Sequence, residues 1–169
     1  MAGSAIIRRL LRVPERVDTD FYLQFLFFKY VLGINRSAPW PIHFSSRIAA
    51  PERVKAGRCS YPGDMPGCYI QGINGIEIGD YCIFAPGVGI ISASHDPTKL
   101  DSHVPASPIR IGHHCWVGMH AVILPGVQLG EHTTVGAGSV VTHSFPEGHC
   151  VIAGNPARLI RKLEPPTSG

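Results

Sequence analysis

An aliphatic residue returns at every sixth position between Ile111 and Val141, and this spacing constrains the fold more than any other feature. The six hexapeptides read IGHHCW, VGMHAV, ILPGVQ, LGEHTT, VGAGSV and VTHSFP. Six is a multiple of the two-residue strand period but not of the 3.6-residue helix period, so each hexapeptide places one apolar side chain on the same face of a short strand. The repeat predicts stacked coils around a narrow core, which is an all-β solenoid.

Small residues accompany the aliphatic positions. A glycine follows directly in four of the hexapeptides, and a second, shorter side chain lies four places after the aliphatic residue. These shorter residues are Cys115, Ala121, Val127, Thr133 and Ser139. Each hexapeptide is therefore predicted to be a strand with a small second inward residue, followed by a turn.

The six-residue spacing also extends toward the N-terminus. Two more sets keep it, namely Ile42, Ile48 and Val54, and Ile78, Phe84 and Ile90. Because Val54 and Ile78 are separated by a multiple of six, we expect them to be in phase, with irregular coils over residues 59–75. The gap from Ile78 to Ile111 breaks the phase, which predicts a loop excursion around residues 95–108, a stretch rich in Pro, Ser and Asp.

Composition excludes several classes of protein. A chain of 169 residues with 44% hydrophobic content has the size and core of a single domain. Its net charge of +3 comes without a run of basic residues interleaved with aromatics, so nucleic-acid binding is not expected. The five cysteines are odd in number and lack CxxC spacing, which indicates neither a disulfide framework nor a zinc ribbon. These features favour a reducing, cytoplasmic setting.

Residues 1–40 form a separate, apolar segment for which a helix is expected. The run from Phe21 to Gly33 is almost wholly apolar, with Asp18 or Asp20 placed to cap a helix and Gly33 to end it. The run is too short to span a bilayer and does not fit a signal peptide. Two compatible interpretations stay open: a helix packed across the end of the solenoid, or an anchor at the inner face of an anionic membrane, helped by nearby arginines. Those arginines are Arg8, Arg9 and Arg12.

The segments at residues 78–97 and 108–163, together with the hexapeptides, resemble the hexapeptide-repeat acyltransferases. The likeness is greatest to the galactoside, maltose and serine O-acetyltransferase group and to polysaccharide O-acetyltransferases. This resemblance covers residues 41–163. It implies a left-handed parallel β-helix over residues 41–154, an exception to the usual right-handed crossover, followed by a basic C-terminal tail over residues 155–169. It also implies a homotrimer with active sites between neighbouring subunits.

The resemblance implies transfer of an acetyl group from acetyl-CoA, a co-substrate, to a hydroxyl. His95 occupies the position of the family's catalytic histidine, and an imidazole has the pKa range that a general base needs at neutral pH. Asp96 is a candidate for orienting that ring. The backbone at Gly118 and Met119 matches the position that stabilises the oxyanion. No metal is expected.

Further positions match the family's coenzyme A site. The phosphates would be held by the basic residues Arg158 and Arg161, and guanidinium groups suit this task. His143 stands where relatives commonly have lysine, which weakens the expectation of a phosphate contact there. The remaining candidates for contact with the donor are Trp116, Ala137, Gly138 and Thr142.

The expected acceptor is a small molecule or saccharide. A sugar unit of a surface polysaccharide or its lipid-linked precursor is favoured, because an apolar N-terminal segment would keep the enzyme at the membrane where such precursors are made. Tyr69, Gln71 and Asn74 are candidates for binding its hydroxyls. An amino sugar, a serine or an antibiotic hydroxyl stays open, as does a larger acyl group. A scaffold or nucleotide-sugar-binding solenoid without catalysis is the alternative. A γ-type carbonic anhydrase is disfavoured, because its zinc needs two histidines separated by four residues and no two of the nine histidines have that spacing.

Overall fold

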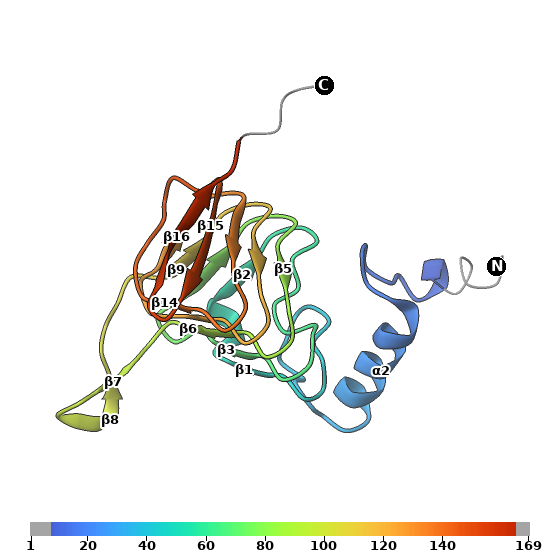
Figure 1. Ribbon diagram of the computed structural model, residues 1–169. Helices are drawn as coiled ribbons and strands as arrows, with labels where there is room; N and C mark the ends of the chain where they lie inside the picture. Colours follow the sequence, from blue (N-terminus) through green and yellow to red (C-terminus); the bar gives the residue numbers. More distant parts are fainter. Residues whose placement is uncertain (1–7, 165–169) are drawn as a thin grey trace.

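The computed structural model describes residues 8–164 and consists mainly of short strands in parallel sheets, with few helices (Figure 1). The first sheet contains β1 (Arg47–Ala49), β3 (Tyr69–Gln71), β6 (Gly89–Ile91), β11 (Val122–Ile123) and β14 (Val140–Val141). The second contains β2 (Val54–Ala56), β4 (Ile76–Ile78), β9 (Ile109–Ile111) and β12 (Gln128–Leu129). The third contains β5 (Ile83–Phe84), β10 (Trp116–Val117), β13 (Thr133–Val135), β15 (Cys150–Gly154) and β16 (Ala157–Lys162). From β3 to β13 the chain visits the sheets in a fixed rotation, first, second and third.

The hexapeptides set this arrangement. Three of them make one coil, so Ile111 pairs with Leu129 on the second sheet and Val117 pairs with Val135 on the third. All six aliphatic residues of the repeat are buried, and so are the five shorter side chains that lie four places after them. The prediction that both positions face inward is therefore confirmed, and the core is a narrow column of these side chains.

The expected phase between Val54 and Ile78 is wrong. Val54 pairs with Ile76, whereas Ile78 pairs with Ala56. The first coil is longer than three hexapeptides because residues 57–67 form irregular turns, and the extra length is not a multiple of six. Both ends of β4 are buried, so an aliphatic residue at either position satisfies the core and hides the shift from a search for spacing.

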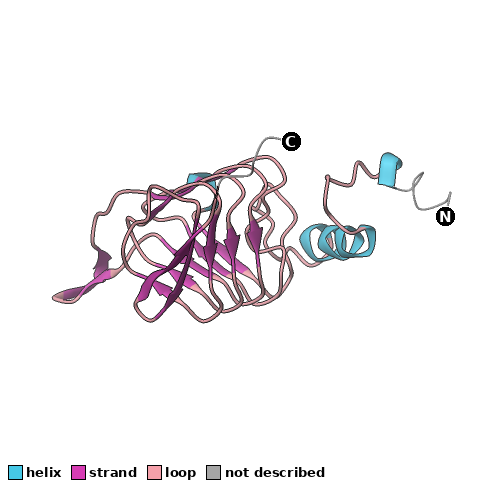
Figure 2. Cartoon of the chain, turned by 45° about the horizontal axis from the view of Figure 1, so that its top comes forward, coloured by secondary structure: helices cyan, strands magenta, loops and turns pink. Residues whose placement is uncertain are grey.

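A hairpin interrupts the rotation between the first and second sheets. Strands β7 (His95–Asp96) and β8 (Lys99–His103) pair in antiparallel fashion and project from the coils (Figure 2). Its base is closed by the Val104 N–H, which donates to the Ser94 carbonyl at 2.9 Å. The hairpin is thus held away from the core and presents its side chains to solvent.

Helix α2 (Thr19–Tyr30) lies beside the first coil (Figure 1). Asp18 is its N-cap, with the carboxylate accepting from the Asp20 and Phe21 N–H groups, as expected for a residue in this position. Phe25 is buried with Ala38 and Ile42, and Ile48 of β1 packs against this cluster. No helix within residues 8–164 is long and apolar enough to cross a membrane.

The C-terminal part differs from the expected tail. Residues 157–162 form β16, which folds back on β15 in antiparallel fashion, and Ala157 is buried in the core. An antiparallel strand at this edge leaves less of the sheet open to pairing with other chains. The short helix η1 (Pro51–Arg53) connects β1 and β2 in the first coil.

Candidate active site

The ring of His95 is held in one orientation at the start of the hairpin. Its Nδ1 lies 2.6 Å from the Leu100 carbonyl oxygen. A carbonyl only accepts, so Nδ1 carries the proton and Nε2 keeps its lone pair. The side chain is exposed, and the His103 ring lies beside it with centroids 4.5 Å apart. In its neutral form the ring therefore carries its lone pair on Nε2, the basic nitrogen of an exposed side chain.

Asp96 does not take the orienting part expected of it. Its Oδ1 accepts from both the N–H and the hydroxyl of Thr98, at 2.7 and 2.6 Å. These two hydrogen bonds lower the pKa of the carboxyl, the side-chain bond most. The carboxylate therefore stabilises the turn of the hairpin, and the Leu100 carbonyl orients His95 in its place.

The three candidates for binding the acetyl acceptor lie on or next to β3, but only one of them has an exposed side chain without a hydrogen-bond partner among the described residues. Tyr69 is well exposed on the outer side of the first sheet. Gln71 is buried, and its Oε1 accepts from the Ala93 N–H at 2.9 Å. The Asn74 amide donates to the carbonyls of Ser92 and Val104, both at 3.0 Å. Gln71 thus holds β3 to the segment that leads into the hairpin, and Asn74 holds the base of the hairpin. Both side chains make structural hydrogen bonds in place of the expected contact with substrate.

The oxyanion candidates lie at the turn after β10. The Gly118 N–H donates to the Val135 carbonyl at 2.8 Å, so this donor is already used within the coils. Within residues 8–164 the Met119 N–H has no hydrogen-bond partner, while its carbonyl accepts from the Gly138 N–H at 2.8 Å. Of the two expected amides, only that of Met119 is free to meet an oxyanion.

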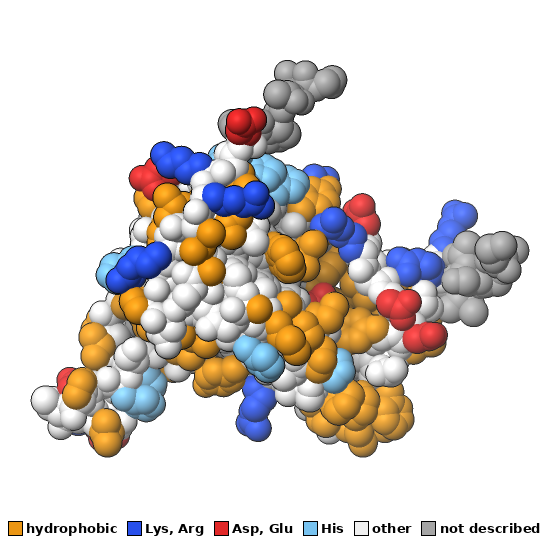
Figure 3. Space-filling model, viewed as in Figure 1, with side chains coloured by type: hydrophobic (Ala, Val, Ile, Leu, Met, Phe, Trp, Pro, Cys, Tyr) orange, Lys and Arg blue, Asp and Glu red, His pale blue; other side chains and the backbone are white. Residues whose placement is uncertain are grey.

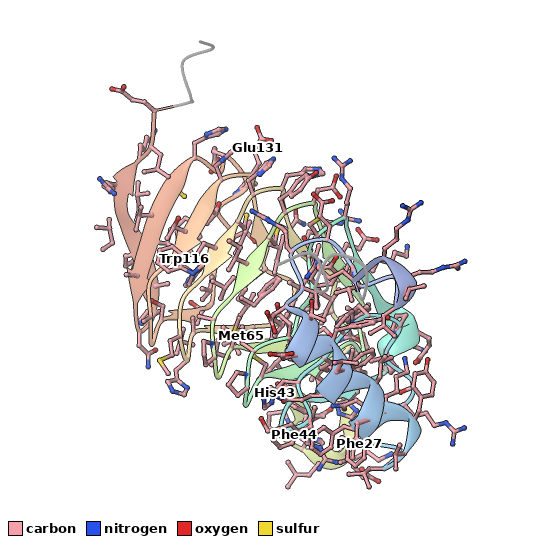
Figure 4. All side chains as sticks on the ribbon, turned by 90° about the vertical axis from the view of Figure 1, so that its right-hand side faces the viewer. Phe27, His43, Phe44, Met65, Trp116 and Glu131 are labelled. Carbon is pink, nitrogen blue, oxygen red and sulfur yellow. The ribbon has the colours of Figure 1, made fainter. Side chains whose placement is uncertain are left out.

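This turn, with β10 before it, forms an exposed edge made largely of backbone. Trp116 is 53% exposed on the outer side of the third sheet (Figure 4). Ala137 and Gly138 are exposed at the equivalent turn of the next coil, and a Cβ on Gly138 would meet nothing within 4 Å. The edge therefore leaves room for a long, thin molecule to lie against the backbone of two coils.

The last group of candidates lies at the C-terminal end of the coils. His143 and Arg158 line one hollow of about 300 Å³, together with Ser144, Phe145 and Ala157. The hydroxyl oxygen of Thr142 is 2.6 Å from Nδ1 of His143. Among residues 8–164, Arg158 donates only to the adjacent Ala157 carbonyl, and Arg161 is exposed on β16. Two exposed guanidinium groups are thus available to an anion at this end.

His95 on the hairpin and the Met119 amide lie at opposite ends of the strands of the first sheet. Strand β6 leads to the hairpin at its C-terminal end, whereas Met119 lies just before the parallel strand β11 that pairs with β6. One chain therefore does not bring His95 to the Met119 amide.

A second hollow, of about 480 Å³, lies on the outer side of the second sheet. Its cations are already paired: Lys55 lies 3.6 Å from one Glu77 oxygen and Arg110 donates to the other at 3.0 Å. The hydrogen bond from Arg110 lowers the pKa of Glu77. Both cations of this hollow share the single carboxylate of Glu77, and no candidate residue lines it.

Sequence reasoning missed two contributors to the site. The Leu100 carbonyl is a backbone atom, so no residue type signals it. His103 is one of nine histidines, and only the hairpin register, which pairs it with His95, places it beside the candidate base. Within the described residues no three His, Cys, Asp or Glu side chains are grouped to hold a metal ion.

Comparison with known proteins identifies relatives along most of the chain. Residues 108–143 match the family model described as bacterial transferase hexapeptide (six repeats). The galactoside O-acetyltransferase of Escherichia coli K12 is 37% identical over 91 residues, which cover 52% of this chain and 44% of that protein. The chain spans about half the length of the curated relatives it matches.

Two solved structures are similar over nearly the whole chain. A maltose O-acetyltransferase from Clostridium difficile 630 has a TM-score of 0.64 and 26% identity, covering 97% of this chain and 86% of that one. A galactoside acetyltransferase in complex with coenzyme A has a TM-score of 0.67 and 25% identity, covering 96% and 80%. The resemblance drawn from the sequence is confirmed: residues 108–143 match the hexapeptide model, and the similar proteins are galactoside and maltose O-acetyltransferases.

Proposed function

We propose that this chain is an O-acetyltransferase that moves an acetyl group from acetyl-CoA to a hydroxyl of a sugar or surface-polysaccharide precursor. The relatives named above act on galactosides and maltose, and one of the similar structures holds coenzyme A. We infer that the coils form a left-handed parallel β-helix and that three copies assemble into a homotrimer. The five free, buried cysteines suit the cytoplasm, where we place the reaction.

The observation that carries this proposal is the hydrogen bond between Nδ1 of His95 and the Leu100 carbonyl. It leaves Nε2 as a base. Nε2 takes the acceptor's hydroxyl proton while that oxygen attacks the thioester carbon, forming the new C–O bond. When the tetrahedral intermediate collapses, the C–S bond breaks and the imidazolium returns the proton to the leaving sulfur. The Leu100 carbonyl stabilises the imidazolium between these steps.

The free Met119 N–H is the proposed donor to the oxyanion. A backbone amide in a packed turn is fixed before the reaction, so it costs no reorganisation when charge develops on the carbonyl oxygen. The Gly118 carbonyl belongs to the same peptide group and accepts from the Ala121 N–H at 3.1 Å, which keeps this peptide in place. The side chain at residue 119 takes no part in this role.

The exposed edge and the C-terminal end fit the two parts of the donor. The backbone at Ala137 and Gly138, with Trp116 beside it, offers a flat edge to the pantetheine arm. Thr142 and His143 would lie further along, and the guanidinium groups of Arg158 and Arg161 would hold the phosphates. His143 would add least to this contact, because an imidazole in its uncharged form attracts phosphate poorly.

Separation of His95 from Met119 within one chain supports a shared site. The homotrimer would place the hairpin of one copy against the Met119 edge of its neighbour, so each site would take its base from one chain and its oxyanion donor from another. Tyr69 is the remaining exposed candidate for contact with the acceptor. The thiol-release assay described next also tests other acceptors, namely an amino sugar, a serine or an antibiotic, and donors with a larger acyl group.

Thiol release from acetyl-CoA with a panel of sugars tests the proposal. His95→Asn removes the base, and His114→Asn is the matched control because His114 is an exposed imidazole on a different edge of the coils. The first change is expected to lower kcat by about 10² to 10⁴ and the second to leave it unchanged. An unaltered rate in His95→Asn refutes the base. Coenzyme A binding with no turnover on any acceptor favours a scaffold or binding protein.

A further inference from the structure

Helix α2 is apolar on two sides, and its own chain covers only one. Tyr22, Phe25 and Leu26 pack against the first coil. A second stripe faces away from it at helical spacing: Leu23, Phe27, Tyr30, Val31 and Ile34 are 44%, 51%, 67%, 67% and 37% exposed. An amphipathic surface helix would carry polar side chains at these positions. The second stripe therefore needs an explanation beyond the fold of this chain.

The exposed stripe continues onto the neighbouring turn. Phe28 stacks on Phe44 with centroids 4.3 Å apart and meets Phe27 edge-on at 5.6 Å. The Asn35 amide donates to the carbonyls of His43 and Ser46, which fixes the turn after the helix beside the turn that carries Phe44. We define the end surface as the exposed side chains of Leu23, Phe27, Tyr30, Val31, Leu32, Ile34 and Phe44.

The end surface lies at the N-terminal end of the molecule. In Figure 3 hydrophobic side chains gather at the lower right, where Figure 1 places α2. Figure 4 shows Phe27 and Phe44 near one another at the end of the helix, far from Trp116. Patches of this kind on a soluble domain mark a docking surface.

Along residues 21–51 the exposed charges are of one sign, and the nearest acidic residue before this stretch is the exposed Asp20 in the first turn of α2. Residues 21–51 contain no Asp or Glu, while Arg36 and Arg47 are exposed within them. Arg36 follows Ile34 by two positions and Arg47 follows Phe44 by three. Lys29 is turned inward, donating to the Ala38 carbonyl at 2.6 Å. Large apolar side chains bordered by exposed cations complement a surface that is anionic outside and apolar just beneath.

We propose that the end surface binds an anionic lipid bilayer, with α2 lying in the plane of the headgroups. The helix has 12 residues, which is too short to span a bilayer, so it would have to lie at the surface. The arginines that supply charge are Arg36 and Arg47. Arg8, which the sequence placed in this role, instead donates to the Val17 carbonyl at 2.7 Å and to Thr19. This surface is separate from the proposed acetyl-transfer site and does not depend on it.

Sedimentation of the full chain with vesicles tests the proposal. We expect binding to vesicles of phosphatidylcholine with phosphatidylglycerol, weaker binding to phosphatidylcholine alone, and weakening by salt. The double variant Phe27→Gln/Leu32→Gln should bind the anionic vesicles at least about tenfold more weakly, and Arg36→Gln should lose part of the difference between the two vesicle types. The matched control, Leu159→Gln/Ile160→Gln, changes two exposed apolar residues of β16 and should bind normally.

Three results overturn the proposal. The first is that the wild-type chain fails to sediment with either kind of vesicle. The second is that the end-surface and control variants bind alike. The third is that light scattering shows smaller oligomers for the end-surface variant than for the wild type, which would assign the surface to contact between copies. Circular dichroism confirms that each variant is folded. Thiol release with a soluble sugar should be unchanged in Phe27→Gln/Leu32→Gln, so failure of the lipid proposal is distinguishable from failure of the proposed acetyl transfer.

Discussion

Gly118→Ala is expected to force two coils apart. A Cβ at this position would lie 2.7 Å from the Ala137 nitrogen and 2.8 Å from the Val135 oxygen. Both are backbone atoms, so no side chain can rotate away. Restoring ordinary contacts near 3.4 Å requires a separation of about 0.6 to 0.7 Å, which is an overpacking change.

The cost follows from the hydrogen bonds that cross this gap. The Gly118 N–H to Val135 carbonyl bond and the Gly138 N–H to Met119 carbonyl bond are both 2.8 Å long. A shift of that size takes both out of good hydrogen-bond geometry. Losing about 1 kcal/mol for each and adding the residual overlap gives a destabilisation of about 2 to 3 kcal/mol. For a chain of this length the melting temperature should fall by about 4 to 12 °C.

Calorimetric unfolding of Gly118→Ala beside Gly89→Ala measures this cost. Gly89 also lies on a strand of the coils, but a Cβ there would meet Val122 at an ordinary 3.5 Å. Neither glycine has a positive φ, so backbone strain does not separate the two variants. Equal melting temperatures for the two proteins would refute the reasoning, because only the inter-coil contact differs.

Two further predictions concern the turn after β10 and a buried carboxyl. Met119→Pro removes the proposed oxyanion donor and should lower kcat by about 10² to 10³, whereas Met119→Ala keeps the N–H and should retain activity. Burial raises the pKa of Asp64 to about 7. Because this folded-state pKa lies above the unfolded value near 4, the stabilising contribution is complete below about pH 4 and is lost as the pH rises through 7. Asp64→Asn should therefore gain stability relative to wild type by about 2 to 3 kcal/mol between pH 5 and pH 8, measured by urea unfolding.

Each of these predictions has a contrary outcome. If Met119→Pro is folded by circular dichroism and its kcat is near wild type, the amide of residue 119 does not contact the oxyanion. If the stability difference between Asp64→Asn and wild type is constant with pH, Asp64 titrates alike in the folded and unfolded chain, and its burial has no energetic effect.

The repeat at Ile111 to Val141 could be predicted from sequence because successive side chains of a strand point to opposite faces of the sheet. One side must be apolar in every coil, so the spacing carries the register directly. In the first coil this logic failed. The irregular turns at residues 57–67 add a length that spacing cannot measure, and Ile76 and Ile78 are equally suitable for the core.

The candidate site was less accessible to sequence reasoning because backbone groups decide it. His95 is identifiable as a residue type in a motif, but the carbonyl that orients it belongs to Leu100 and depends on how the hairpin pairs. Gln71 and Asn74 are amides that suit a sugar hydroxyl equally well, and their engagement with Ala93, Ser92 and Val104 follows only from the three-dimensional path. The freedom of the Met119 N–H has no signature in the residue type.

Diffraction from crystals grown with coenzyme A tests the central claim most directly. The account predicts the thiol sulfur between Nε2 of His95 from one copy and the Met119 N–H of a neighbouring copy, with the phosphates near Arg158 and Arg161. Coenzyme A lying instead in the hollow between Lys55 and Arg110, remote from every His95 ring, would contradict it.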